Sequence, residues 1–286
     1  MKHAFLVIAH NEFVLKYMLN ALDHEYVDIF VHFDKKVKDL PKLSTNKSRL
    51  YVLSERIDTR WGDFSQIETE MVLMAAASKV EHYLFYHIIS GTHLPLKPIT
   101  TILNYYNKLA GKNVFHHLNE GAQNQNILKI RRWNLFTKSY AYGAHWKRRL
   151  YQILNERCIR LQAFWNIYRN KDLKLYQAAN WVSLSDEAVR YILSNEKEIN
   201  QLFKYTFCGD EYFVPTILMA SSLKDTLISP KNILFQDMGA ANARTLTLAD
   251  CDDIINSDCL WARKFSMQED KLVHLIHQHI CMSHEQ

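Results

Sequence analysis

The first 34 residues contain the pattern that most restricts the fold. Residues 3–9 (HAFLVIA) form an apolar run that is too short for a helix, which predicts a buried strand. Residues 11–22 then place apolar side chains at the spacing of one helix face, and residues 27–33 alternate apolar and mostly polar side chains. A strand, a helix and a strand in such close succession predict a βαβ unit. A βαβ unit requires a parallel sheet.

The α/β pattern continues through most of the chain. Residues 82–89 and 114–117 are predicted strands, Pro98 opens a predicted helix, and Ser65–Glu68 has the spacing of a helix capping box. After an interruption the pattern resumes at 180–184, where Ser185 is expected to cap the next helix. We therefore predict one α/β domain with a mostly parallel sheet and a helical insert.

Composition excludes several classes of protein. The chain has 286 residues, of which 48% are hydrophobic, enough for a large core, and only 7 are glycine. Neither the dinucleotide-binding glycine fingerprint nor the phosphate-binding loop is present. The 5 cysteines form no CxxC pair, and no apolar run is long enough to span a bilayer. With no signal-peptide pattern at Met1, the sequence predicts a soluble, cytoplasmic protein.

Charge is concentrated in one part of the chain. Residues 129–174 contain 12 basic and 2 acidic residues, interleaved with tryptophan, tyrosine and phenylalanine, whereas the protein as a whole carries a net charge of +5. This basic, aromatic stretch fits a solvated helical insert or a segment that binds an anionic membrane surface. No nucleic-acid-binding module is recognisable, so we expect no nucleic-acid partner.

The ends of the predicted strands are the first place to look for a site. In an open parallel sheet, ligands bind beyond the carboxyl ends of the strands. His10 follows the first strand, Asp34 ends the second, and Ser90, Gly91 and His93 follow a later one. Asp34 is suited to accept hydrogen bonds from a nucleoside, and a simple turn aspartate is the alternative.

Eight segments together resemble the core-2/I-branching β-1,6-N-acetylglucosaminyltransferases and the related peptide O-xylosyltransferases. They occur in that family's order and extend to residue 265, but residues 118–176 are not covered. The segments are AFLVIAHNE (4–12), DIFVHFDKK (28–36), RWGDFSQIETEMVL (60–73), YHIISGTHLPLK (86–97), AANWVSLSDEAVRYIL (178–193), GDEYFVPTIL (209–218), ARTLT (243–247) and ARKF (262–265).

The resemblance implies a GT-A-type glycosyltransferase that uses a UDP-sugar, with N-acetylglucosamine as the expected sugar, in an inverting single displacement. It divides the single domain into a nucleotide-binding half (1–117), the basic aromatic insert (118–176) and an acceptor and catalytic half (177–286). The expected product belongs to bacterial surface polysaccharide. The acceptor would be a glycan hydroxyl, lipid-linked in one version, with the enzyme at the inner face of the plasma membrane.

The family's functional residues can be placed by matching motifs. The resemblance implies that Glu211 is the general base, that Arg244 and Lys264 hold the donor diphosphate, and that His10 and Asp34 lie near the nucleoside. The expected donor and acceptor pocket contains six further residues, which are Trp61, Ser90, Gly91, His93, Trp181 and Asp210. The chain departs from the family at His93, where relatives commonly have aspartate. That departure makes the donor sugar an open question.

Charge neutralisation on the departing UDP separates the remaining hypotheses. The favoured hypothesis uses the arginine–lysine pair and needs no metal or other cofactor. A second hypothesis uses a metal ion held by Asp250 and Asp252, although these residues also fit an acidic helix start. A third is an inert carbohydrate- or membrane-binding module, which has no chemical need to keep Glu211, Arg244 and Lys264 together.

Overall fold

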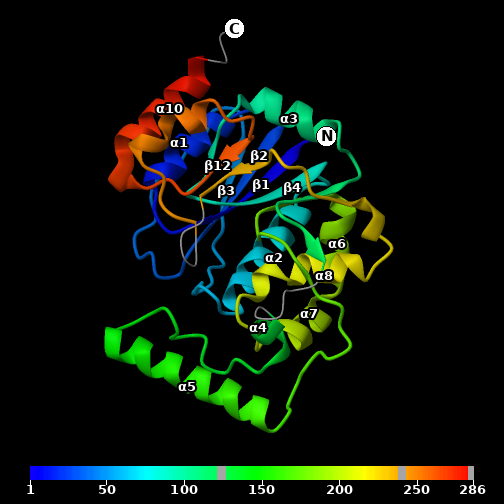
Figure 1. Cartoon of the computed structure of the whole chain (residues 1–286). Coiled ribbons are helices and arrows are strands. Elements are labelled where there is room, and N and C mark those ends of the chain that lie inside the picture. Colours follow the sequence, from blue (N-terminus) through cyan, green and yellow to red (C-terminus); the bar gives the residue numbers. More distant parts are fainter. Residues whose placement is uncertain (121–126, 238–242, 283–286) are drawn as a thin grey trace.

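A computed structural model describes residues 1–120, 127–237 and 243–282. Within these ranges the central sheet has seven strands in the order β10-β6-β9-β4-β1-β2-β3 (Figure 1). The strands are β1 (His3–Ala9), β2 (Val27–Phe33), β3 (Arg49–Val52), β4 (Phe85–Ser90), β6 (Asn113–Phe115), β9 (Val182–Leu184) and β10 (Leu227–Ile228). All of them run parallel to one another except β9, which is antiparallel to both of its neighbours. The predicted α/β class, mostly parallel sheet and helical insert are confirmed.

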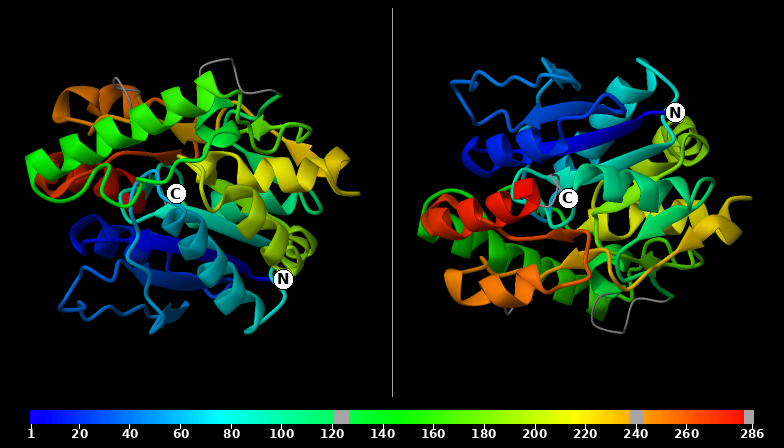
Figure 2. Two further views of the ribbon diagram at one scale, coloured as in Figure 1. Left: turned by 90° about the horizontal axis from the view of Figure 1, so that it is seen from below. Right: turned by 90° about the horizontal axis from the view of Figure 1, so that it is seen from above.

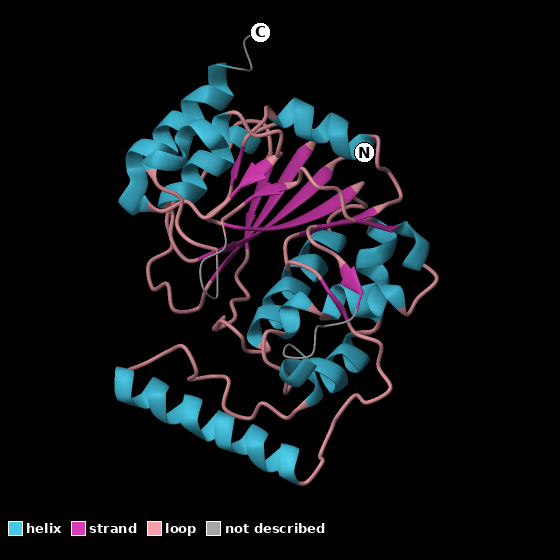
Figure 3. Ribbon diagram, viewed as in Figure 1, coloured by secondary structure: helices cyan, strands magenta, loops and turns pink. Residues whose placement is uncertain are grey.

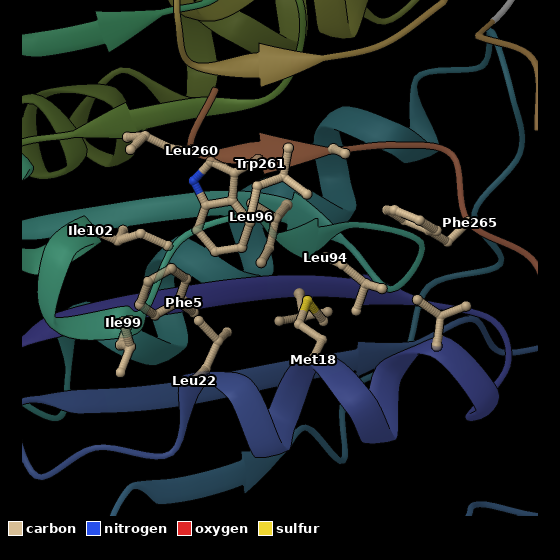
Figure 4. Close-up of a cluster of buried hydrophobic side chains, with 14 of the residues drawn as sticks. Phe5, Met18, Leu22, Leu94, Leu96, Ile99, Ile102, Leu260, Trp261 and Phe265 are labelled. Carbon is tan, nitrogen blue, oxygen red and sulfur yellow. The ribbon is translucent and has the colours of Figure 1, made fainter. Parts of the chain in front are cut away.

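Helices cover both faces of this sheet (Figure 3). One face carries α1 (Phe13–Leu22), α3 (Ile99–Asn107), α9 (Cys251–Ile255) and α10 (Asp270–Met282), and the other carries α2 (Ser65–Ser78), α6 (Asp186–Ser194), α7 (Glu196–Phe203) and α8 (Phe213–Met219). Because side chains alternate along a strand, Phe5 and Val7 of β1 join the first core while Ala4 and Leu6 join the second. Figure 4 shows part of the first core, where Phe5 lies close to Leu22 and Trp261.

Two small sheets complete the fold. β11 (Leu234–Phe235), β12 (Trp261–Ala262) and β5 (Leu94–Pro95) form a three-stranded sheet, and β12 leads directly into Arg263 and Lys264. β7 (Asn119–Glu120) pairs with β8 (Tyr176–Gln177) in antiparallel fashion. This second pairing brings the two ends of the basic aromatic insert together. Short 3₁₀ helices lie at Gly209–Glu211, Lys224–Thr226, Leu248–Asp250 and Met267–Glu269.

The insert extends away from the sheet. It contains α4 (Ile127–Arg131) and the long α5 (His145–Phe164), and residues 121–126 of it lie outside the described part. Helix α5 and the C-terminal helix α10 lie at opposite ends of the molecule (Figures 1 and 2). Among the described residues, no helix is long and apolar enough to cross a membrane.

Two capping predictions had different outcomes. Ser185 caps α6 as expected, because its side chain accepts the Ala188 N–H. The capping box at Ser65–Glu68 was wrong, because α2 has no side-chain cap at its start. The Ser65 hydroxyl instead accepts the Arg60 N–H at 2.9 Å. This bond fixes the loop before α2, and that loop carries Trp61.

Candidate functional site

A cavity of about 580 Å³ opens between segments that are distant in the sequence. It is lined by Trp61, Trp181, Asp210, Glu211 and Lys264, which brings together five of the predicted site residues. Neutral amide side chains complete much of the wall together with His117, and these amides are Gln66, Asn119, Gln177, Asn180 and Gln236. The six other predicted residues, described below, are not part of this wall, and they are His10, Asp34, Ser90, Gly91, His93 and Arg244.

Glu211 is held at the cavity wall by the neighbouring β8 segment. Gln177 Nε2 donates to Glu211 Oε2 at 2.9 Å, and Ala178 N–H donates to the Glu211 carbonyl at 2.9 Å. The approach is set by Cys208, whose left-handed backbone (φ 51°) turns the chain into the 3₁₀ helix Gly209–Glu211. Glycine is required next, because a Cβ at position 209 would collide with Thr206 Oγ1. The result is a half-buried carboxylate that faces the cavity.

Asp210 lies deeper than Glu211 and has different electrostatics. Its Oδ2 accepts from Gln66 Nε2 at 2.9 Å, and its Oδ1 has no hydrogen-bond partner in the described part of the chain. Burial, reinforced by the Glu211 carboxylate, raises the pKa of Asp210 to about 7. The nearby Glu70 on α2 is wholly buried, and burial likewise raises its pKa well above the ordinary value. Asp210 therefore exchanges its proton near neutral pH.

Two cations face the cavity from the segment after β12. The Arg263 guanidinium lies 4.7 Å from the centre of the Trp181 ring, and burial lowers the pKa of Arg263 to about 10. Within the described residues, neither Arg263 nor Lys264 forms an ion pair with a carboxylate. Both side chains therefore offer positive charge to a bound anion without first breaking an ion pair.

The strand ends form a second cluster beside this segment. Asp34 is buried and accepts the Lys36 N–H at 2.8 Å, while Lys36 Nζ lies 2.7 Å from its other oxygen. Partial enclosure and the Lys264 ammonium lower the pKa of His10, and the Asp34 carboxylate opposes them. His10, Asp34 and Lys264 are thus electrostatic neighbours, as expected for residues at adjacent ends of β1 and β2.

Ser90, Gly91 and His93 form a tight turn behind the cavity. Ser90 Oγ lies 2.9 Å from His93 Nδ1, and Gly91 N–H donates to the Ile8 carbonyl at 2.8 Å. A Cβ at position 91 would lie 3.3 Å from the Ala9 side chain, so the close approach of β4 to β1 favours glycine. The buried His93 ring packs edge-on against Trp181 at 4.8 Å. His93 therefore acts on the cavity wall through Trp181.

Arg244 is committed to two carboxylates. Its Nη1 and Nη2 bind Asp250 at 2.8 and 2.6 Å, and its Nε binds Asp237 at 2.6 Å. Asp250 also accepts the Thr247 N–H and completes a capping box, so its interpretation as an acidic helix start is confirmed. In the described part of the chain, no group of three or more His, Cys, Asp or Glu side chains is placed to share a metal ion. The assignment of Arg244 to the diphosphate remains a prediction.

The insert contacts the site through its first loop. Tyr142 hydroxyl accepts the Trp61 N–H at 3.3 Å, and the Arg60 guanidinium donates to the Lys138 carbonyl at 2.6 Å. The Trp61 ring also packs edge-on against Phe207, just before the turn that presents Glu211. The cavity wall therefore includes a tryptophan whose position depends on the insert.

Sequence reasoning missed three residues of the site. Gln66 and Gln177 hold the two carboxylates, and Arg263 supplies a cavity cation. Gln66 and Arg263 lie within matched segments, so their proximity to functional residues was visible as sequence spacing. Gln177 lies one residue before such a segment, and the tertiary bond from the Ala178 N–H to the Glu211 carbonyl places it beside Glu211.

The match to a family model agrees with the resemblance. The chain belongs to the Core-2/I-Branching enzyme family, whose model matches residues 3–237. It is a glycosyltransferase, and the α/β, GT-A-like fold expected from the sequence is confirmed. A sequence search of curated proteins finds no match. Among solved structures, the chain is similar to the apo form of mouse xyloside xylosyltransferase 1, with 9% identity and a TM-score of 0.38. That alignment covers 94% of this chain and 98% of the mouse chain.

Proposed function

We propose that this glycosyltransferase moves a sugar, N-acetylglucosamine in the first instance, from a UDP-sugar to a glycan hydroxyl with inversion and without a metal. The observation that carries the proposal is the placement of the Glu211 carboxylate and the Arg263 and Lys264 cations on one cavity wall. A base for the acceptor and positive charge for the leaving group are the two services that a single displacement needs.

The proposed step has a simple balance. The acceptor oxygen attacks C1 of the sugar, its proton passes to Glu211, and the bond between C1 and the diphosphate oxygen breaks as UDP leaves. Glu211 suits the base role because Gln177 orients one carboxylate oxygen, while the other oxygen accepts no hydrogen bond from the part of the chain that the structure describes. The neighbouring acid Asp210 lies in the same short helix and is more deeply buried than Glu211.

The departing diphosphate gains negative charge as the bond breaks. Arg263 and Lys264 are placed to stabilise that charge, and Arg263 stays protonated at neutral pH because its pKa is about 10. His10 and Asp34, next to Lys264, are then suited to contact the nucleoside. In the metal-dependent alternative, Asp250 and Asp252 would bind the ion. Asp250 would first have to leave Arg244 and its cap.

The acceptor half of the proposal rests on the chemistry of the wall. Trp61 and Trp181 provide aromatic faces, and the neutral polar side chains suit the hydroxyl groups of a sugar. We retain a bacterial surface-polysaccharide intermediate as the proposed acceptor, with its lipid carrier at a cytoplasmic membrane face. An inert binding module is a weaker proposal, because binding alone does not require an oriented carboxylate and two cations in the same cavity.

A donor screen tests this function. UDP, UDP-N-acetylglucosamine, UDP-glucose and UDP-xylose would each be tested for thermal stabilisation and for slow hydrolysis, with and without excess chelator. We expect the largest effect from UDP-N-acetylglucosamine and no loss in chelator. Activity that disappears in chelator and returns with manganese would support the metal-dependent alternative. Stabilisation by no nucleotide sugar would contradict the proposal.

A further inference from the structure

Helix α5 has an unusual distribution of side chains. Its two buried side chains, Asn155 and Gln162, are both polar. Gln162 Nε2 donates to the Trp133 carbonyl at 2.9 Å and Gln162 Oε1 accepts the Trp133 N–H at 2.8 Å. Asn155 donates to the Asn134 side chain at 3.2 Å. The inward face of α5 is therefore attached by hydrogen bonds.

The outward face of α5 carries the large apolar side chains. Trp146, Phe164 and the adjoining Trp165 are 70%, 79% and 69% exposed, and Leu150 and Leu161 are also exposed. At 3.6 residues per turn, positions 146, 150, 161 and 164 fall on one stripe, opposite Asn155 and Gln162. A water-facing helix normally shows the reverse arrangement. In the isolated protein, the apolar side chains of this stripe are therefore exposed to water and have no apolar surface to pack against.

The same face is strongly basic. Lys147, Arg149, Arg157 and Arg160 are exposed along the stripe, and the single acidic residue of the helix, Glu156, is paired with Arg160 at 2.5 Å. Two copies of this helix packed face to face would bring like charges together. An anionic surface is complementary to the positive charge of this face. The exposed aromatic rings and leucines also require an apolar layer below that anionic surface.

We propose that α5 is an interfacial helix whose outward face binds the surface of an anionic phospholipid bilayer. Arginine and lysine contact the headgroups while Trp146, Phe164 and Trp165 enter the interface. One basic residue of α5 does not belong to this face. Arg148, between Lys147 and Arg149, is half-buried with its Nε enclosed, so it belongs to the inward side.

This surface is connected to the cavity through a short path. Tyr142, in the loop before α5, accepts a hydrogen bond from the backbone of Trp61 on the cavity wall. Docking of α5 would therefore place the acceptor side of the cavity near the bilayer, where a lipid-carried acceptor would be found. Membrane binding itself does not depend on which sugar is transferred.

Vesicle co-sedimentation tests the proposal with the full chain. We expect binding to vesicles of 70% phosphatidylcholine and 30% phosphatidylglycerol, reduced by salt, and little binding to pure phosphatidylcholine. The triple variant Arg149→Glu, Arg157→Glu and Arg160→Glu should weaken binding roughly a hundredfold or more, since each basic residue near the surface contributes substantially. The matched control, Lys38→Glu, Lys42→Glu and Lys47→Glu, changes the net charge equally on another exposed loop and should retain most of the binding.

A second variant isolates the apolar part. Trp146→Ser, Phe164→Ser and Trp165→Ser should abolish the blue shift of tryptophan fluorescence on vesicles and leave UDP-sugar hydrolysis in solution unchanged. Unchanged far-ultraviolet circular dichroism would show that the variant is folded. Equal binding of the wild type to neutral and anionic vesicles, binding to neither, or a dimer that dissociates in the serine variant would overturn the proposal. Failure of the donor screen with intact vesicle binding would refute only the proposed reaction.

Discussion

In the central sheet, apolar side chains such as Phe5 and Val31 are fully buried between two layers of helices, whereas in α5 the largest apolar side chains face outward. Ten of the twenty exposed large hydrophobic residues found in the described chain lie between 128 and 168. The strands of the sheet are buried on both faces, whereas α5 is amphipathic, and its apolar stripe alone does not tell which side of the helix is buried. In α5 the orientation follows from the face that makes the hydrogen bonds. In α5 the hydrogen-bonded face is turned inward.

The largest expected difference between the α/β domain, which holds the cavity, and α5 is in catalysis. Glu211→Gln should lower turnover roughly 10²–10⁴-fold while UDP affinity is nearly unchanged, because the amide cannot accept the acceptor proton. The serine triple variant of α5 should keep normal turnover with a soluble acceptor. Steady-state rates and calorimetric UDP binding would measure both. A Glu211→Gln enzyme with near-normal turnover would show that this carboxylate is only structural.

The second difference is in how stability depends on pH. The folded-state pKa of Asp210 is about 7 and the ordinary value is 3.8, so the folded protein binds this proton more tightly than the unfolded chain. The contribution of Asp210 to the free energy of unfolding is therefore complete below about pH 4. It is lost as the pH rises to 7, which lowers the free energy of unfolding by about 4 kcal/mol. Asp210→Asn should remove that loss.

Chemical denaturation of both proteins from pH 4 to 8 would test this. The variant-minus-wild-type difference cancels buried histidines such as His87, whose pKa is lowered by burial. Glu156→Gln in α5 is the matched control, because an exposed ion pair contributes little. Parallel curves for Asp210→Asn and wild type would contradict the prediction.

A matched pair of leucines compares the packing directly. Leu22 is fully buried at the end of α1 (Figure 4). Changing it to alanine should lower the free energy of unfolding by about 2–5 kcal/mol, because the substitution leaves a cavity. Leu161→Ala near the end of α5 should change it by less than about 0.5 kcal/mol. Thermal or urea unfolding would measure both. A large cost at Leu161 would mean that α5 packs against the protein in solution.

The smallest expected difference concerns the cations. Arg263→Ala should weaken UDP binding and slow transfer about tenfold or more, since a charge-assisted contact with the diphosphate is lost. Arg149→Ala in α5 should leave UDP binding unchanged. Arg244→Ala should have the intermediate effect, because Arg244 is already paired with Asp237 and Asp250. A larger loss at Arg244 than at Arg263 would favour the assignment from the family resemblance.

Prediction from the sequence succeeded for the strands whose hydrophobic pattern marks where they begin and end. The bounds of β1 and β2 matched the apolar run at 3–9 and the alternating run at 27–33. Both strands are buried on both faces of the parallel sheet. The motif residues that line the cavity were also found. Local sequence pattern could not predict which side chains form hydrogen bonds with one another in the folded protein. Gln66 lies inside the predicted capping box, yet its side chain holds Asp210, and the inward side of α5 is defined by its tertiary hydrogen bonds.

The antiparallel β9 has a consequence for the newly made chain. β4 pairs with β1 on one side, but its other edge is closed by β9, and residues 91–181 must be synthesised first. At about 5–20 residues per second, the ribosome needs on the order of 5–20 s to deliver them. During that interval Phe85–Ser90 is an open strand edge, the kind of surface on which nascent chains associate. Translation speed and growth temperature should therefore govern the soluble yield of this enzyme more strongly than its final stability does.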